Sequence, residues 1–126
     1  MAIVKISDAE LPIMKYIWKH APITAAQLVA YAAEEFEWNK NTTYTVIKRL
    51  CDRGALLRSE PNFVITPLVT CGEVQRAETD ELIDKVYEGS LKMFLLSFFQ
   101  REDLSQAELS ELKELIAHKE KDMEDG

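Results

Sequence analysis

Apolar side chains recur three and four positions apart in three stretches of the first half of the chain. This is the spacing of one face of an α-helix, and it predicts three amphipathic helices that share a core. The helices are expected from about Asp8 to His20, from Ala25 to about Phe36, and from about Asn41 to Gly54. Their apolar stripes are Leu11, Met14, Ile17 and Trp18 in the first, Leu28, Val29 and Ala32 in the second, and Val46, Ile47 and Leu50 in the third.

A tight two-stranded hairpin is predicted after the third helix. Gly54 ends that helix, and short strands follow from Ala55 to Arg58 and from Phe63 to Thr66, with the turn SEPN between them. The Pro22-Ile23 step suits one further, very short strand. Three helices followed by a hairpin make a winged helix-turn-helix, so the predicted fold class is mainly α with a small β-hairpin.

The second half, from Thr70, is predicted to be entirely helical. One long helix should end near Gly89, a second spans residues 91–99, and a third carries apolar residues from Leu109 to Ile116, followed by a charged tail that is expected to fray. The segment 91–99 is apolar nearly all round, and such a helix must be buried. Since a unit of about 57 residues buries too little surface for a good core of its own, we predict a homodimer formed through this half. Its interface is expected at Leu91, Phe94, Leu95, Phe98, Phe99, Leu112 and Ile116.

Four sequence pairs have the spacing of a capping box at a helix start. In each, a Ser or Thr precedes a Glu or Gln by three positions, which allows two otherwise free backbone amides to be bonded. The pairs are Ser7–Glu10, Thr24–Gln27, Thr70–Glu73 and Ser105–Glu108. For the third helix, Asn39 and Asn41 are both suitable N-cap residues.

The net charge of −7 is divided unequally between the two halves. Residues 1–69 carry +1, and residues 70–126 carry −8. Between residues 38 and 58, one acidic side chain, Asp52, stands against five basic ones, Lys40, Lys48, Arg49, Arg53 and Arg58. Exposed charges more than about 8–10 Å apart are largely screened at cellular salt. The acidic half therefore does not prevent a basic surface in the first half from contacting phosphate.

The exposed face of the predicted third helix carries Thr42, Thr45, Lys48 and Arg49. Short hydroxyl and long cationic side chains are the kinds that contact base edges and phosphates in a major groove. A helix with this face, followed by a wing, predicts binding to double-stranded DNA. The predicted organisation is a winged-helix DNA-binding domain at residues 1–69 and a helical dimerisation domain at residues 70–126.

Four segments spread over nearly the whole chain resemble the penicillinase-repressor family of the BlaI/MecI type. They are ISDAELPIMKYIW, NTTYTVIKRL, RSEPNFVITP and LLSFFQREDLS. The resemblance implies a dimeric winged-helix repressor that binds a palindromic operator upstream of β-lactamase or related resistance genes. Each wing-bearing half would enter one half-site, and the C-terminal helices would hold the dimer.

The resemblance also assigns residues to the DNA surface. By position, the base and phosphate contacts of the family fall on Asn41, Thr42, Tyr44, Thr45, Lys48 and Arg49. Tyr44 stands where some members carry a basic residue, so the base preference there is an open question. In the predicted wing, Arg58 and Asn62 are expected to reach phosphates.

Two ways of ending repression occur in families of this kind. Some members are inactivated when a membrane sensor protease cuts an Asn-Phe bond in the dimerisation half. The aligned pair here is Ser97-Phe98, in which the Phe matches and the Asn does not. A copper-responsive branch carries a cysteine-rich tail of the CxC type, and the absence of such a motif here argues against release by copper.

Other function classes have less support in the sequence. The two histidines, His20 and His118, belong to no recognisable catalytic set, and no glycine-rich phosphate loop is present, so we expect neither an enzyme nor a cofactor. Cys51 and Cys71 form no CxxC or CxC pair, which favours two reduced cysteines over a disulfide framework or a metal site. A winged helix that docks on protein is the alternative, although such a face is usually more apolar at its centre.

The N-terminal residues have none of the features of a secretory leader. The longest apolar run, from Met93 to Phe99, is interrupted by Ser97 and is much shorter than a bilayer requires. A cytoplasmic protein is therefore expected.

Overall fold

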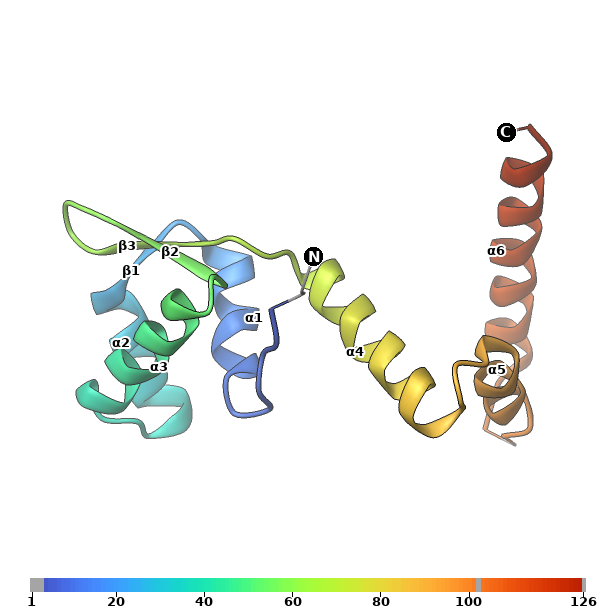
Figure 1. Ribbon diagram of the computed structural model, residues 1–126, viewed down its shortest axis with the longest axis horizontal. Coiled ribbons are helices and arrows are strands. Elements are labelled where there is room, and N and C mark those ends of the chain that lie inside the picture. The colour runs from blue at the N-terminus through green and yellow to red at the C-terminus, as the bar shows by residue number, and fades with distance from the viewer. Residues whose placement is uncertain (1–3, 102, 126) are drawn as a thin grey trace. The chain divides into compact units, whose positions relative to one another are not determined.

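The computed structural model describes residues 4–101 and 103–125, which form two compact units, one up to Glu81 and one from Leu82 onward. The first unit contains three helices and a small sheet, shown in blue to green in Figure 1, and most of a fourth helix. Its elements are α1 (Leu11–His20), β1 (Ile23–Thr24), α2 (Ala25–Phe36), α3 (Lys40–Asp52), β2 (Leu56–Ser59) and β3 (Val64–Pro67). Three further helices follow, namely α4 (Cys71–Val86), α5 (Leu91–Phe99) and α6 (Gln106–Asp125). The predicted fold class, mainly α with a small hairpin, is confirmed.

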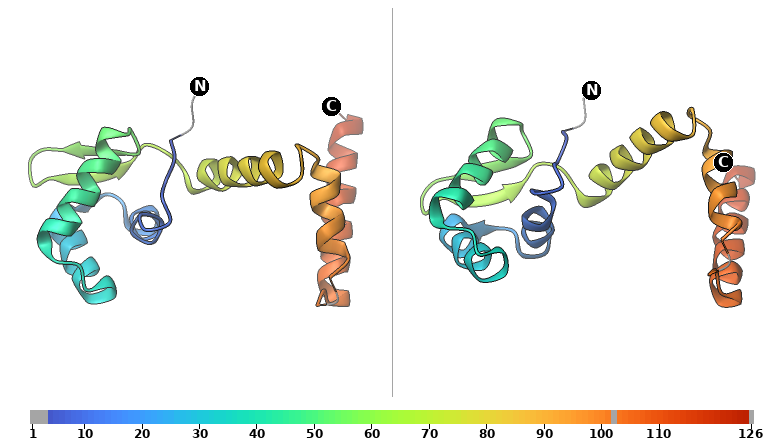
Figure 2. Two further views of the ribbon diagram at one scale, coloured as in Figure 1. Left: turned by 60° about the horizontal axis from the view of Figure 1, so that its bottom comes forward. Right: turned by 90° about the horizontal axis from the view of Figure 1, so that it is seen from below.

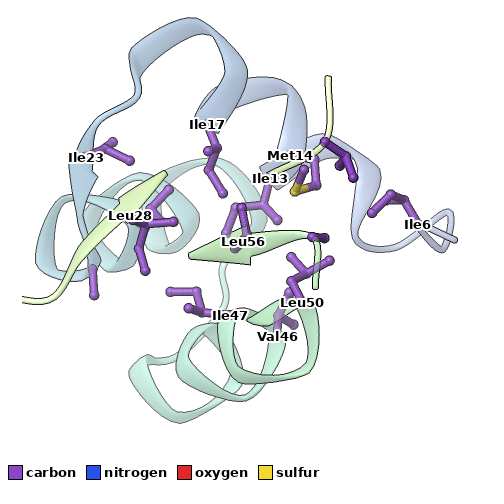
Figure 3. Packing of buried hydrophobic residues seen from close by; sticks show 14 of the residues in the cluster. Ile6, Ile13, Met14, Ile17, Ile23, Leu28, Val46, Ile47, Leu50 and Leu56 are labelled. Carbon is purple, nitrogen blue, oxygen red and sulfur yellow. The ribbon is translucent and has the colours of Figure 1, made fainter. Parts of the chain in front are cut away.

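One apolar core holds α1, α2, α3 and the sheet together, as Figure 3 shows from close by. The predicted stripes of α1 and α3, and Leu28 of α2, belong to this core or pack against it, with Leu11 and Trp18 only half-buried. Ala32 is buried and Val29 is half-buried. Ile13, which lay outside the predicted stripe, is fully buried beside Met14. The Trp18 indole N–H donates to the Val69 carbonyl at 2.9 Å, which fixes the chain where it leaves β3.

The sheet is antiparallel, with strand order β1-β3-β2. Arg58 lies opposite Ile65 and Ser59 opposite Val64, so the hairpin turn contains residues 60–63. Both hairpin strands begin one residue later than predicted, and for β2 the reason is that Ala55 completes the end of α3 instead. Gly54 adopts a left-handed φ of 83°, and the Ala55 amide donates to the Leu50 carbonyl at 2.9 Å. This is the helix termination in which glycine is favoured at the left-handed position.

All four predicted capping boxes are present. In the box of α2, the Gln27 amide donates to Thr24 Oγ1 at 3.2 Å, and the Thr24 amide donates to Gln27 Oε1 at 3.0 Å. The same reciprocal pairs occur at the other three predicted positions. The Ser7 box closes a turn, and α1 itself begins at Leu11 instead of Asp8. Of the two asparagines considered for α3, Asn39 is the cap and accepts from the Thr42 amide at 2.8 Å.

The boundary between the compact units lies inside α4, later in the chain than the predicted boundary between residues 69 and 70. Val74 is 5 % exposed and belongs to the winged-helix core, so the first turns of α4 complete that core. Lys5 also forms an ion pair with Glu81 at 3.1 Å. Figure 2 shows α4 as one continuous helix after β3.

The second unit has little core of its own. Ile83 is the one apolar side chain of this unit that is buried among the described residues. The prediction of a frayed tail after Ala117 is wrong, since α6 continues to Asp125, while Gly126 lies outside the described residues. Residues 118–126 include two Lys, two Glu and one Met, which lose little side-chain entropy in a helix.

The described part of the chain contains no helix that is both long enough and apolar enough to cross a membrane. Within the same residues, no cluster of histidine, cysteine, aspartate or glutamate has the arrangement of a metal site.

Candidate nucleic-acid interface

Helix α3 presents a polar face because its opposite face is anchored in the core. Val46, Ile47 and Leu50 are buried, and Thr43 is fully buried with its hydroxyl donating to the Asn39 carbonyl at 3.2 Å. Side chains three and four positions apart share a face of a helix. The exposed residues of α3 are Lys40, Asn41, Thr42, Thr45, Lys48, Arg49 and Asp52. Five of the six predicted recognition residues of α3 are therefore together on one surface.

Thr45 has its hydroxyl proton already engaged. Its Oγ1 donates to the Asn41 carbonyl at 2.8 Å, one turn earlier in the helix. A threonine hydroxyl has one donor and two acceptor sites. In this orientation Thr45 can still accept a hydrogen bond from a base amino group and can offer its methyl group to a thymine methyl.

Tyr44 departs from the expected arrangement, because it lies at the junction of α3 and the wing. Its ring is half-buried and packs edge-on against Phe63, with 5.7 Å between centroids. The ammonium of Lys40 lies 5.9 Å from the same ring. Tyr44 therefore couples the position of the wing to that of α3.

The wing is organised by Phe63, a residue that the sequence reasoning did not single out. Phe63 has a φ of 51°, and its carbonyl accepts from the Ala25 amide at 2.9 Å. Asn62 before it is exposed and has a φ of 72°, a left-handed conformation that asparagine tolerates better than most residues. The Arg58 guanidinium lies 4.0 Å from the centre of the Phe63 ring. In the sequence, the one feature that could have indicated this role of Phe63 is that it is an aromatic residue beside a turn.

Several basic side chains already have acidic partners. Lys48 Nζ is 3.0 Å from Asp52 Oδ2, and the Arg58 guanidinium is 3.0 Å from Glu60 Oε1. Within residues 4–101 and 103–125, no such ion pair involves Arg49 or Lys40. A DNA phosphate must therefore compete with a carboxylate of the described residues for Lys48 and Arg58, but not for Arg49 or Lys40.

Arg53 contributed to the basic segment of the sequence but is a structural residue. Its guanidinium binds the Glu10 carboxylate and donates to the Lys5 carbonyl at 2.8 Å. Burial tends to raise the pKa of Glu10, but hydrogen bonds from Ser7 and from Arg53, together with the charge of Arg53, outweigh it and lower the pKa below its usual value of 4.5. The pair connects the end of α3 to the segment before α1.

A groove of about 300 Å³ separates α3 from the wing. The surface of the groove is mainly apolar but includes charged side chains. The residues that line it are Tyr44, Ile47, Lys48, Cys51, Asp52, Arg58 and Phe63. Cys51 is a free, half-buried thiol whose pKa is raised by burial and by the charge of Asp52. A raised pKa leaves less thiolate at neutral pH, so Cys51 behaves as a small apolar residue.

The residues predicted for the dimer interface lie in the second unit. Leu91, Leu95, Phe98, Phe99 and Ile116 are exposed, whereas Phe94 and Leu112 are half-buried. Phe94 packs edge-on against Tyr87 and Phe98, with centroid distances of 5.4 and 5.1 Å.

The pair Ser97-Phe98 lies within α5. The Ser97 hydroxyl donates to the Phe94 carbonyl at 2.7 Å and lies 3.0 Å from the Tyr87 hydroxyl. Because proteases generally bind extended segments, cleavage at this bond would require α5 to unwind locally.

Comparison with known proteins places these features in a family. The family model described as penicillinase repressor matches residues 6–118. The penicillinase repressor of Bacillus licheniformis is 31% identical over 116 residues, which cover 90% of this chain and 91% of that protein. The methicillin resistance regulatory protein MecI of Mammaliicoccus sciuri is 31% identical over 117 residues, which cover 91% of this chain and 95% of that protein.

Two solved structures are similar to a little over half of this chain. The solution structure of the DNA-binding domain of the repressor BlaI superposes with a TM-score of 0.53 and 35% identity, covering 57% of this chain and 90% of that one. The solution structure of the monomeric form of Bacillus licheniformis BlaI in complex with the blaP half-operator gives a TM-score of 0.50 and 34% identity. It covers 58% of this chain and 93% of that one. The chain belongs to the penicillinase-repressor family.

Proposed function

We propose that this protein is a dimeric transcriptional repressor that binds DNA sequence-specifically. The observation that carries the proposal is the exposed polar and cationic face of α3 next to a wing, on a fold similar to that of BlaI. In the related complex, BlaI in its monomeric form is bound to a half-operator. Repression follows from occupancy of promoter DNA and requires neither catalysis nor a cofactor.

In the proposed complex, α3 enters the major groove. Thr42 and Thr45 contact base edges, and Lys48 and Arg49 contact phosphates, the roles for which hydroxyl and cationic side chains are suited. Asn41 lies at the start of the same exposed face. Tyr44 acts partly through the wing, because its ring packs on Phe63.

The wing is proposed to contact the sugar-phosphate backbone beside the major groove. Arg58 and Asn62 are both exposed, and Arg58 is oriented by the Phe63 ring. These contacts position the protein on the duplex and carry no sequence information themselves.

Dimerisation is proposed for the helices that follow the winged-helix domain. Exposed Leu91, Leu95, Phe98 and Phe99 form an apolar surface on α5 that one protomer leaves uncovered. Two copies related by a two-fold axis would bind an operator with two inverted half-sites. We assign DNA binding to residues 1–69 and dimerisation to residues 70–126, with the first turns of α4 completing the core of the first domain.

We propose that the regulated genes are resistance genes, such as a β-lactamase gene, because the similar proteins are repressors of penicillinase and regulators of methicillin resistance. A repressor of such genes acts in the cytoplasm, where the DNA lies. If a membrane sensor protease ends repression at Ser97-Phe98, the hydrogen bond from Ser97 to Phe94 has to break first.

The proposal is tested by selecting bound sequences from a pool of random duplexes with the purified full chain at near-physiological salt. We expect an inverted repeat to be enriched, whose half-site identifies candidate promoters. Recovery of DNA without sequence preference would contradict the proposal and favour a winged helix that docks on protein.

A further inference from the structure

Each of two cations proposed to contact phosphate already lies against a carboxylate on the same surface. Lys48 is paired with Asp52 one turn later on α3, at 3.0 Å. Arg58 is paired with Glu60 in the wing through two hydrogen bonds of 3.0 and 3.1 Å. All four side chains are more than half exposed. A phosphate that reaches either cation therefore meets a carboxylate at the same place.

Arg58 has a second contact that holds it in position, whereas Lys48 is held by its pair with Asp52. The Arg58 guanidinium also stacks 4.0 Å from the centre of the Phe63 ring, which orients it without Glu60. Asp52 is the last residue of α3 and the one acidic residue between residues 38 and 58. It lines the groove between α3 and the wing together with Lys48 and Arg58.

We propose that Asp52 and Glu60 are internal competitors for DNA phosphates and limit the general affinity of the protein for DNA. This inference rests on the proposed function, since it assigns a role within the same surface. When Lys48 or Arg58 turns to a phosphate, its ion pair breaks and a carboxylate is left close to the negative backbone. Both effects oppose binding.

The expected effect is modest because the ion pairs are exposed. Such pairs contribute roughly 0.2–1 kcal/mol, so removal of one carboxylate charge should tighten binding about 1.5- to 5-fold. The gain should shrink as the salt concentration rises, since salt screens exposed charges. Because phosphates are the same in every sequence, the gain should be equal on operator and on random DNA.

The experiment compares Asp52→Asn and Glu60→Gln with matched controls elsewhere in the chain. Asp80→Asn removes the same charge from an i,i+4 pair with Arg76, and Asp103→Asn removes it from a bidentate pair with Arg101. Binding of the full chain is measured by fluorescence anisotropy on a random-sequence duplex and on the selected operator. Salt is varied from about 50 to 200 mM, a range over which several phosphate contacts change the affinity by orders of magnitude.

We expect both test variants to bind both duplexes more tightly than the wild type and than either control. Asp52→Asn should lose part of its gain when combined with Lys48→Ala, because no ion pair then has to break and only the repulsion between Asp52 and the DNA backbone is relieved. Thermal unfolding of each variant verifies that the fold is retained.

Test variants that bind no more tightly than Asp80→Asn and Asp103→Asn would overturn the inference. A gain confined to the operator, or one that is undiminished in the Lys48→Ala background, would do the same. A wild-type protein that binds neither duplex at any salt concentration would instead refute the proposed function, so the two failures are distinguishable.

Discussion

The ion pair between Arg53 and Glu10 provides a quantitative test of how the winged-helix domain is held together. The Glu10 side chain is 8% exposed, whereas that of Arg53 is 38% exposed. Replacement of Arg53 by Ala leaves a buried carboxylate without its cation and also removes the hydrogen bond to the Lys5 carbonyl. Truncation of one partner in a fully buried pair costs about 3–5 kcal/mol.

We expect a smaller loss here, for two reasons. Arg53 is partly solvated, and Glu10 keeps its hydrogen bond from the Ser7 amide at 2.9 Å. The expected cost of Arg53→Ala is therefore about 1–2 kcal/mol of unfolding free energy at neutral pH. It is measured by urea unfolding of the full chain. Arg49→Ala, which removes an exposed cation from the same helix, is the matched control and should cost less than about 0.5 kcal/mol.

The pH dependence follows from the lowered pKa of Glu10. In the folded protein this pKa lies below 4.5, so the ionised carboxylate stabilises the fold at pH values above 4.5. That contribution is lost as the pH falls below 4.5 and through the folded-state pKa. The difference in stability between wild type and Glu10→Gln should therefore narrow on acidification.

DNA binding separates this structural role from a phosphate contact. Arg53→Ala should leave the salt dependence of DNA binding unchanged, whereas Arg49→Ala should reduce the slope of log K against log salt by about 1. An Arg53→Ala protein as stable as the wild type, or one with a reduced salt slope, would refute the assignment of Arg53 to the fold.

Three further predictions concern the two proposed functional surfaces. Lys48→Ala should weaken binding to all sequences about equally and reduce the salt slope by about 1, as measured by titrations on operator and random duplexes. Thr45→Ala should instead relax the preference at one operator position by roughly 1–3 kcal/mol, and identical behaviour of the two variants would contradict the proposed docking of α3. Phe98→Asp should place a charge in the proposed dimer interface and convert the protein to a monomer in sedimentation experiments, with weaker operator binding. A dimer that persisted at the same concentrations would exclude Phe98 from the interface.

Local patterns in the sequence were sufficient to predict the helices and to predict which side chains of α3 form its exposed polar face. A capping box involves residues three positions apart, and an apolar stripe involves residues within one or two turns, so both can be recognised along the chain. The predicted range of α5 and the predicted start and end of α2 agree with the structure for this reason. The side chains opposite a buried stripe are exposed by helix geometry alone, which is why Thr42, Thr45, Lys48 and Arg49 are together on one surface.

Contacts between distant segments were decided only by the tertiary structure. Arg53 was counted with the basic residues of α3, but it binds Glu10 at the start of the fold, and no local pattern encodes that pairing. Phe63 orients Arg58 and meets Tyr44 because the left-handed turn at Asn62 and Phe63 brings its ring against α3. Val74 completes the first core although its helix begins after the predicted boundary. Each of these contacts depends on how separate elements pack, whereas periodicity and capping depend only on the geometry of a single element.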